Sequence, residues 1–124
     1  MTKNHFVLDT NAVIFLTARG KTIPSLLSNK LNEAALFISV ITEIELFAKP
    51  SMPLDKEEKL HSFISDRISV IDITSDVKKE TIAIRRNTKL KLPDSIIAAT
   101  SIILNAFQNR WLTPGSKTCP YDHA

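Results

Sequence analysis

Short apolar runs that alternate with helical patterns constrain the fold of this chain more than any other feature. The apolar runs predict buried strands at residues 5–8, 35–40 and 68–73, with a fourth strand at Trp111 and Leu112. Between them, helices are expected from near Asn11 and over 24–31, 42–48, 54–67, 75–89 and 93–107. Thr42 is the expected cap of the helix over 42–48, and the helix over 54–67 is expected to be polar and exposed. Parallel strands need such crossover helices. The pattern therefore predicts a three-layer α/β/α fold around a mainly parallel sheet of four or five strands.

Size and composition narrow the class of protein. A chain of 124 residues suits one domain over 1–124, and a net charge of +3 permits a polyanionic ligand without requiring one. The single cysteine, Cys119, excludes an internal disulfide, and two glycines, Gly20 and Gly115, are too few for a phosphate-binding loop. No apolar run reaches the ~20 residues of a membrane span. We therefore expect a cytoplasmic protein with no membrane association.

Asp9 stands at the end of the first expected strand. In open α/β sheets the carboxyl ends of the strands border the crevice that binds ligands, so Asp9 is placed to take part in chemistry. The alternative is structural, because Asp9 or Asn11 would also cap the helix that follows. The residues alone leave both interpretations open.

Two carboxylates follow the second expected strand. Glu45 has the apolar helix neighbours Ile41 and Ala48, while Glu43 faces Leu46. A carboxylate near an apolar surface needs a cation, hydrogen bonds or a proton, and a metal ion would satisfy it directly. Otherwise these two residues are solvated carboxylates at the edge of the helix.

Asp94 follows Pro93 in the first turn of a strongly apolar helix. Helix N-termini stabilise carboxylates, so a simple electrostatic role is one interpretation. Taken with Asp9 and Glu45, however, Asp94 completes a set of three carboxylates at element boundaries. Such oxygen ligands suit a hard cation, Mg²⁺ or Mn²⁺ as its substitute.

Three segments resemble the acidic motifs of PIN-domain nucleases, and most closely those of VapC-like toxins of bacterial toxin–antitoxin pairs. They are FVLDTNAVI (6–14), ISVITEIELFA (38–48) and LKLPDSIIAATSI (90–102). The resemblance covers nearly the whole chain, from Phe6 to Thr113, and implies a PIN-like fold. By motif match, Asp9, Glu45 and Asp94 form the catalytic and metal-binding site.

The resemblance also implies roles for neighbouring residues and an activity. Thr10 and Asn11 complete the first motif, Glu43 is the second choice after Glu45, and Thr113 stands where a Thr ends the fourth strand. The implied activity is a metal-dependent endoribonuclease that cleaves RNA by water attack and is inhibited by a cognate antitoxin.

Six basic residues lie on the helix and loop that lead to Asp94. They are Lys78, Lys79, Arg85, Arg86, Lys89 and Lys91. Basic groups beside a metal site would bind RNA phosphates and make binding depend on salt. A solvated basic helix face is the alternative.

The chain departs from the family pattern near its end. PIN domains usually carry a fourth acid shortly after the Thr of the fourth strand, and here Gly115 or a neighbour without a carboxylate fills that place, in an atypical tail from about residue 114. Asp122 is a substitute only if the tail folds back. The second hypothesis is therefore a degenerate PIN domain that binds a partner or RNA without cleavage.

A third hypothesis is a phosphotransferase or phosphatase with Asp9 as nucleophile. It is disfavoured because Asn11 stands where a second Asp would be expected.

Two protein contacts follow from the family resemblance. An antitoxin would cover the groove beside Leu46 and Phe47 and insert a basic side chain among the acids. VapC-like proteins commonly form homodimers, and Leu26 and Leu27 would supply such a face, although core packing is the alternative use of both residues.

Overall fold

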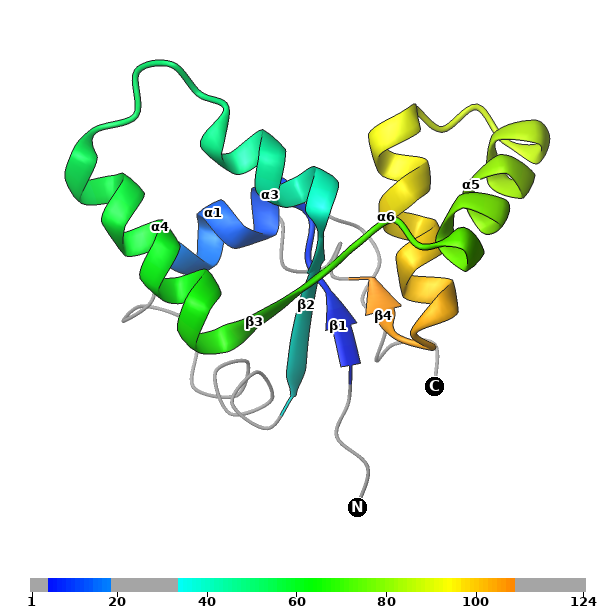
Figure 1. The fold of residues 1–124 in the computed structure, drawn as a ribbon, viewed down its shortest axis with the longest axis horizontal. Coiled ribbons are helices and arrows are strands. Elements are labelled where there is room, and N and C mark those ends of the chain that lie inside the picture. Colours follow the sequence, from blue (N-terminus) through cyan, green and yellow to red (C-terminus); the bar gives the residue numbers. More distant parts are fainter. Residues whose placement is uncertain (1–4, 19–33, 109–124) are drawn as a thin grey trace.

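The computed structural model describes residues 5–18 and 34–108 of the chain (Figure 1). Its elements, in chain order, are β1 (His5–Val7), α1 (Thr10–Ala18), β2 (Ala35–Ser39), α3 (Val40–Phe47), α4 (Leu54–Arg67), β3 (Ile68–Ile71), α5 (Ser75–Asn87), α6 (Leu92–Ile103) and β4 (Phe107–Gln108). The alternation of strands and helices predicted from the sequence is confirmed over these residues.

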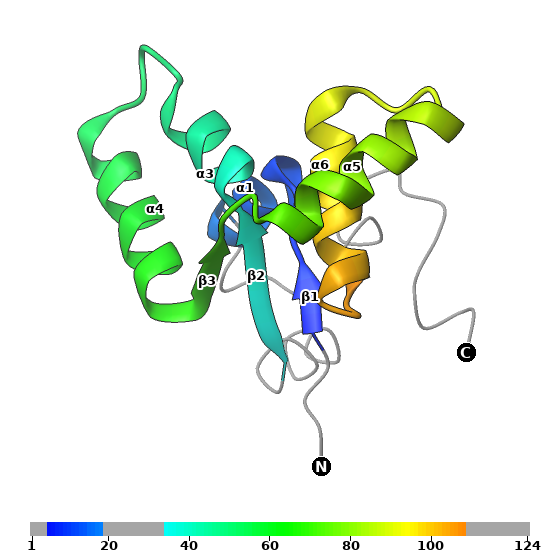
Figure 2. The ribbon, with the colours of Figure 1, turned by 45° about the vertical axis from the view of Figure 1, so that its right-hand side comes forward.

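The four strands form one sheet in the order β3-β2-β1-β4, and every neighbouring pair is parallel. Phe6 pairs with Leu36 on one side and with Phe107 on the other, so β1 and β2 occupy the centre. Helices α1 and α4 lie on one face and α5 and α6 on the other, as Figures 1 and 2 show. This arrangement is the predicted three-layer α/β/α fold.

Each face of the sheet has its own apolar cluster. The larger one joins α1, α4 and α3 to the strands through buried side chains that include Phe6, Leu8, Val13, Ile38, Leu46, Leu60 and Ile64. The smaller one lies between α5 and α6 and contains Val77, Ile96 and Ala99, with Ile41 and Ile84 packed against it. In the part of the chain that the structure describes, no helix has the length and apolar character needed to cross a membrane.

Helix α3 begins earlier than the sequence suggested. Ser39, the last residue of β2, is its N-cap, and the Ser39 hydroxyl accepts a hydrogen bond from the Ile41 amide at 3.2 Å. The prediction of Thr42 as cap is wrong, because Thr42 lies inside the helix and is fully buried. The chain therefore passes from strand to helix without a loop, and this fixes α3 at the carboxyl end of β2.

Helix α6 ends at Ile103, not near Phe107 as predicted. Asn105 adopts the left-handed conformation with φ 50°, a common way to end a helix. The amides of Asn105 and Ala106 bond back to the carbonyls of Ile102 and Ser101 at 3.1 and 2.8 Å. The chain then enters β4 beside β1.

Other expected boundaries move by a few residues or fall outside the described ranges. Strand β3 stops at Ile71 and α5 at Asn87. The predicted helix over 24–31, with Leu26 and Leu27, lies outside the described residues, as do the predicted strand at Trp111 and Leu112 and the tail from residue 114.

Candidate functional site

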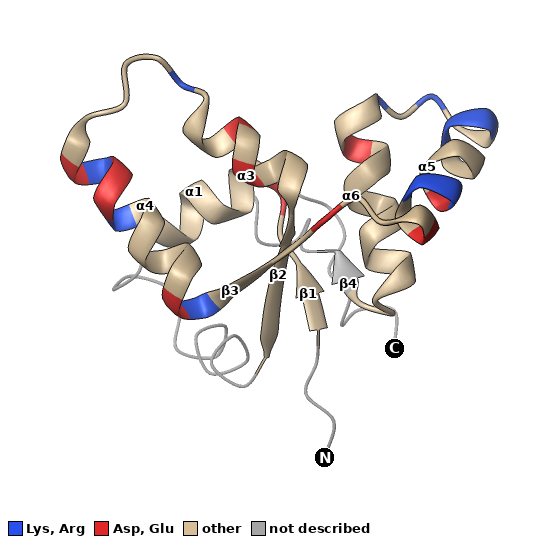
Figure 3. Cartoon of the chain, viewed as in Figure 1, with Lys and Arg blue, Asp and Glu red and all other residues tan. Residues whose placement is uncertain are grey.

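The three candidate acids come from elements that meet at the carboxyl end of the central strands. Asp9 lies between β1 and α1, Glu45 lies on α3, which follows β2, and Asp94 lies in the first turn of α6. Helix α6 contacts β1, β2 and α3. Figure 3 shows acidic segments of α3 and α6 on either side of the ends of β1 and β2. The topology thus brings all three sequence motifs to the edge where open α/β sheets bind ligands.

Asp9 caps helix α1. Its Oδ1 accepts the Ala12 amide at 2.8 Å, and its backbone carbonyl accepts the Val13 amide at 3.1 Å. The structural interpretation of Asp9 is therefore confirmed, with Asp9 and not Asn11 as the cap. Capping does not exclude a site role, because a carboxylate has two oxygens with several lone pairs, and the cap bond fixes the direction of the group.

Glu45 is tied to the first motif by a hydrogen bond. The Thr10 hydroxyl donates to Glu45 Oε1 at 2.9 Å, across 35 positions of sequence, and both side chains are partly buried. This bond joins α1 to α3 directly beside Asp9. Glu45 is therefore hydrogen-bonded to the residue that follows Asp9 in the chain, and its role as the preferred of the two glutamates stays a prediction. Glu43 is partly buried in the first turn of α3.

Asp94 is exposed at the start of α6. The residue after it, Ser95, is fully buried, and its hydroxyl donates to the carbonyl of Lys91 at 2.9 Å, which secures the first turn. An exposed aspartate can change its rotamer without disturbing the core. Over residues 5–18 and 34–108, no three acidic, histidine or cysteine side chains come together closely enough to hold a metal ion.

The donors at this edge nevertheless have the chemistry that a hard cation prefers. Asp9 and Glu45 offer carboxylate oxygens, and the adjoining Thr10 is a hydroxyl residue. Another hydroxyl is buried one turn before Glu45, since Thr42 is fully buried and its Oγ1 lacks a hydrogen-bond partner among the described residues. The residues therefore suit a hard divalent cation in kind.

The six basic residues singled out from the sequence are all exposed on α5 and the loop before α6 (Figure 3). They do not all present a free guanidinium or ammonium group. The Arg85 Nη1 donates to the Leu90 carbonyl at 2.5 Å. The same carbonyl lies 3.4 Å from the Ser95 hydroxyl. Arg85 therefore holds the α5–α6 loop in place.

Further bonds inside the α5–α6 loop restrict its conformation. The Thr88 hydroxyl donates to the Ile84 carbonyl at 2.8 Å and accepts the Leu90 amide at 3.3 Å. Lys89 and Lys91, both exposed, extend from this bonded loop close to Asp94 in sequence.

Some residues of this site were not singled out from the sequence. Ser39 and Ser95 position α3 and α6, and both are buried. Ser39 is the N-cap of α3, a recognisable capping signal, whereas Ser95 lies inside α6 and donates to the Lys91 carbonyl. Asp72 is an exposed acid directly after β3 and so ends a strand as Asp9 does.

Asn11 is exposed on α1. Thr113, Gly115 and Asp122 lie outside the described residues.

Comparison with known proteins agrees with this fold. The PIN domain family profile matches residues 6–107, which is most of the chain. A comparison with curated proteins found no match.

Among solved structures, the chain is similar to VapBC2 from Rickettsia felis bound to a DNA fragment from their promoter, with a TM-score of 0.70 and 21% identity over 84% of each chain. It is also similar to a toxin–antitoxin complex from Klebsiella pneumoniae, with a TM-score of 0.64 and 27% identity over 82% of each chain. DNA-bound VapBC from Salmonella typhimurium matches with a TM-score of 0.61 and 30% identity, over 82% of this chain and 80% of that chain. The chain belongs to the PIN domain family.

Proposed function

We propose that this chain is a VapC-like toxin, an endoribonuclease that depends on Mg²⁺ or Mn²⁺ and is inhibited by a cognate antitoxin. The observation that carries the proposal is the Thr10–Glu45 hydrogen bond, which joins the first two acidic motifs beside the Asp9 cap. PIN domains of VapC proteins are nucleases in general, and the similar solved structures are toxin–antitoxin complexes.

Asp9, Glu45 and Asp94 would hold the metal ion, and this assignment is supported by the hydrogen bonds that orient Asp9 and Glu45. The chemistry that such an ion supplies is polarisation of a phosphoryl oxygen and ionisation of a water molecule. Thr10 is a positioning residue, because its hydroxyl holds the Glu45 carboxylate in one orientation. Asn11, Glu43 and Thr113 are supporting candidates by motif match.

RNA phosphates would bind to the basic residues of α5 and the α5–α6 loop. Lys89 and Lys91 are the strongest candidates, because the bonded loop fixes the backbone that carries them. Lys78, Lys79 and Arg86 lie further along the exposed surface of α5. Arg85 would act through the loop, since its guanidinium is bonded to the Leu90 carbonyl.

The antitoxin partner is proposed from the toxin–antitoxin complexes that share this fold. Phe47 remains partly exposed beside the buried Leu46 and stacks on His61 of α4 with ring centroids 4.2 Å apart. The surface beside these residues remains the proposed contact. A homodimer is also proposed, by family analogy.

RNA cleavage in Mg²⁺ and Mn²⁺ tests the proposal. We expect Asp9→Asn, Glu45→Gln and Asp94→Asn each to abolish cleavage, and we expect the control Glu58→Gln, at an exposed glutamate of α4, to retain it. Cleavage that persists in all three variants would refute the assignment of the site.

Metal binding has a readout besides cleavage. A ligand that binds only the folded chain stabilises it by ~2.7 kcal/mol at a hundred times its dissociation constant. Mn²⁺ should therefore raise the urea midpoint of the wild-type chain and raise it much less for Asp94→Asn. Stabilisation without cleavage would favour the degenerate PIN domain, the alternative that the missing fourth acid near Gly115 supports.

A further inference from the structure

Thr42 carries a buried hydroxyl that differs from the others in this fold. Its side chain is fully buried on α3, and its Oγ1 has no hydrogen-bond partner among the described residues. The other buried hydroxyl side chains in residues 5–18 and 34–108 all take part in hydrogen bonds, and they are Ser39, Thr81, Ser95, Thr100 and Ser101. Thr42 is therefore the exception within the described part of the chain.

The start of α3 explains why the usual local bond is missing. The hydroxyls of Thr81 and Thr100 each donate to the carbonyl four residues earlier in the same helix, at 2.7 Å. Thr42 lies in the first turn after the N-cap Ser39, so the residue four positions earlier is Ile38, which belongs to β2 and not to the helix. The hydroxyl therefore needs a partner other than the carbonyl that serves Thr81 and Thr100.

A buried hydroxyl without a hydrogen bond is unfavourable, and native proteins rarely contain one. Val has nearly the shape of Thr and would fill the same space without this cost. The Thr42 hydroxyl therefore indicates a polar partner from outside the described residues, and water is the smallest such partner.

The position of Thr42 on α3 relates it to Glu45. Thr42 precedes Glu45 by three residues and Leu46 by four, so the three side chains share one side of the helix. Leu46 is buried in the larger apolar cluster, and Glu45 accepts the hydroxyl of Thr10, so this side of α3 is turned toward α1. Thr42 lies one turn closer to the sheet than Glu45, because α3 begins at the carboxyl end of β2.

Asp9 lies at the same corner of the sheet. Strand β1 runs parallel to β2, and the Leu8 amide donates to the Phe37 carbonyl at 2.8 Å. Asp9 follows Leu8 directly, so it stands near the end of β2 at Ser39, three residues before Thr42. The two strands and α3 thus bring the buried hydroxyl and the two oriented acids to one corner.

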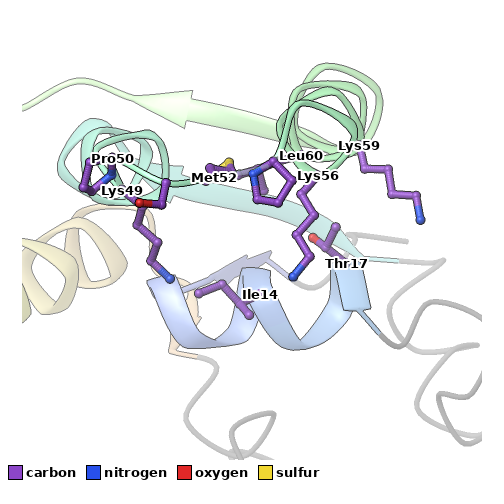
Figure 4. A pocket seen from close by; sticks show the side chains of 10 residues that line it. Ile14, Thr17, Lys49, Pro50, Met52, Lys56, Lys59 and Leu60 are labelled. Carbon is purple, nitrogen blue, oxygen red and sulfur yellow. The ribbon is translucent and has the colours of Figure 1, made fainter.

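The pocket beside α1 does not account for this hydroxyl. It has a volume of about 600 Å³ and lies between α1, the α3–α4 connection and α4 (Figure 4). Its described lining includes Ile14, Lys49 and Leu60, but neither Thr42 nor any carboxylate. A ligand in this pocket would therefore leave the Thr42 hydroxyl as it is.

We propose that Thr42 is an uncharged residue of the cation site, and that its hydroxyl bonds to a water molecule held by the cation. The inference rests on the proposed metal-dependent nuclease and adds to its site a residue that is not an acid. Mg²⁺ keeps several water molecules when carboxylates bind it, and a Thr hydroxyl is able to accept a hydrogen bond from such a water. Thr42 would be a positioning residue, because it touches this water and not the RNA.

Binding of Mn²⁺ to the whole chain tests the inference, with free Mn²⁺ measured from its electron paramagnetic resonance signal. The variants are Thr42→Val, which removes the hydroxyl, and Thr42→Ser, which keeps it. Thr81→Val is the matched control, because Thr81 is also buried but lies on α5, which carries none of the three acids. Urea unfolding of the same variants without metal separates binding from folding.

We expect Thr42→Val to weaken Mn²⁺ binding by ~10- to 100-fold, the usual effect of losing a group that orients a metal ligand. Thr42→Ser and Thr81→Val should bind Mn²⁺ as the wild-type chain does. Without metal, Thr42→Val should be at least as stable in urea as the wild-type chain, because a buried hydroxyl without a partner is replaced by a methyl group. Weaker binding with undiminished stability distinguishes a role toward the cation from a role in folding.

The relaxation of water protons by bound Mn²⁺ gives a second readout, because it reports on the water that the ion holds. At saturating Mn²⁺, Thr42→Val should change this relaxation per bound ion, whereas Thr81→Val should not.

Three results would contradict the inference. Wild-type Mn²⁺ affinity in Thr42→Val would overturn it, while Mn²⁺ binding and RNA cleavage by the wild-type chain upheld the proposed function. A Thr42→Val variant that is less stable than the wild-type chain without metal would show that another group of the chain bonds to the hydroxyl, and this would also overturn it. A wild-type chain that binds no Mn²⁺ would overturn both the inference and the metal dependence of the proposed function.

Discussion

Replacing Thr10 by Val tests whether the hydrogen bond to Glu45 organises the site. Val keeps the shape of Thr and removes the hydroxyl that donates to Glu45 Oε1 at 2.9 Å. Hydrogen bonds to charged groups contribute ~1.5–3 kcal/mol to stability. Both partners are only partly buried, so water replaces part of the bond, and we expect a loss of ~1–1.5 kcal/mol in the free energy of unfolding.

A double-mutant cycle separates this bond from other effects of the substitutions. Urea unfolding of Thr10→Val, Glu45→Ala and the double variant, without metal, should give a coupling energy of ~1 kcal/mol. Thr10→Ser, which keeps the hydroxyl, should retain most of the wild-type stability. A coupling energy below ~0.3 kcal/mol would show that the two side chains act independently and would refute the reasoning.

The same variants connect the bond to activity. Loss of a group that orients a metal ligand typically costs 10- to 100-fold in affinity or activity, so Thr10→Val should slow RNA cleavage by ~10- to 100-fold. Thr10→Ser should restore much of the cleavage rate. Equal rates for Thr10→Val and the wild-type chain would show that Thr10 does not position Glu45 for catalysis.

Asp9→Asn should leave the free energy of unfolding within ~0.5 kcal/mol of wild type, because Asn caps helices as well as Asp. Asp9→Ala should lose ~1 kcal/mol. Urea unfolding measures both, and a destabilised Asn variant would contradict the capping role. Leu46→Ala should lower the free energy of unfolding by ~2–5 kcal/mol, because Leu46 is 1% exposed in the larger core. The matched control Ile44→Ala changes a side chain that is 57% exposed on the same helix, so it should lower this free energy by less than ~0.5 kcal/mol. Arg85→Ala removes the donor to the Leu90 carbonyl, so limited proteolysis should cut the α5–α6 loop faster than in the wild-type chain. An unchanged rate of proteolysis would show that Arg85 does not hold the loop.

Local patterns predicted the elements well where one signal dominated. Helix α4 spans Leu54–Arg67, the range that the sequence predicted. The prediction of an exposed helix is wrong on one side, because Leu60 and Ile64 are buried in the larger core. At α3 two hydroxyl residues competed for the cap. Ser39 and Thr42 are both good N-caps, and the sheet decides between them, since pairing of β2 with β3 continues up to Ser39 opposite Ile71.

The end of α6 also could not be predicted from the local sequence pattern alone. The apolar pattern continues through Phe107, whereas Asn105 is a common helix terminator. The point at which α6 gives way to β4 depends on the edge of β1, where Phe6 pairs with Phe107. Such pairing joins residues a hundred positions apart, so it is not visible in a local window of sequence.

The candidate site also has features that the sequence predicted and features that it did not. Each acid was identified from its place beside a strand or in an apolar helix. The Thr10–Glu45 bond could not be predicted from the residues, because it depends on how α1 packs against α3. Conversely, the pattern of basic residues suggested six equivalent phosphate contacts, and the structure shows that Arg85 is bonded to the Leu90 carbonyl of the loop.

The hydrogen bonds at this edge divide the three acids into two classes. Asp9 and Glu45 are held at 2.8 and 2.9 Å by groups of α1, one by the Ala12 amide and the other by the Thr10 hydroxyl. Asp94 is exposed on α6, and among the described residues the three acids do not form one cluster that could hold a metal ion. Carboxylates repel one another, so a bound cation would favour the close approach of a third. In the proposed nuclease, the two fixed acids would therefore determine where the cation binds, and the cation would draw Asp94 toward them.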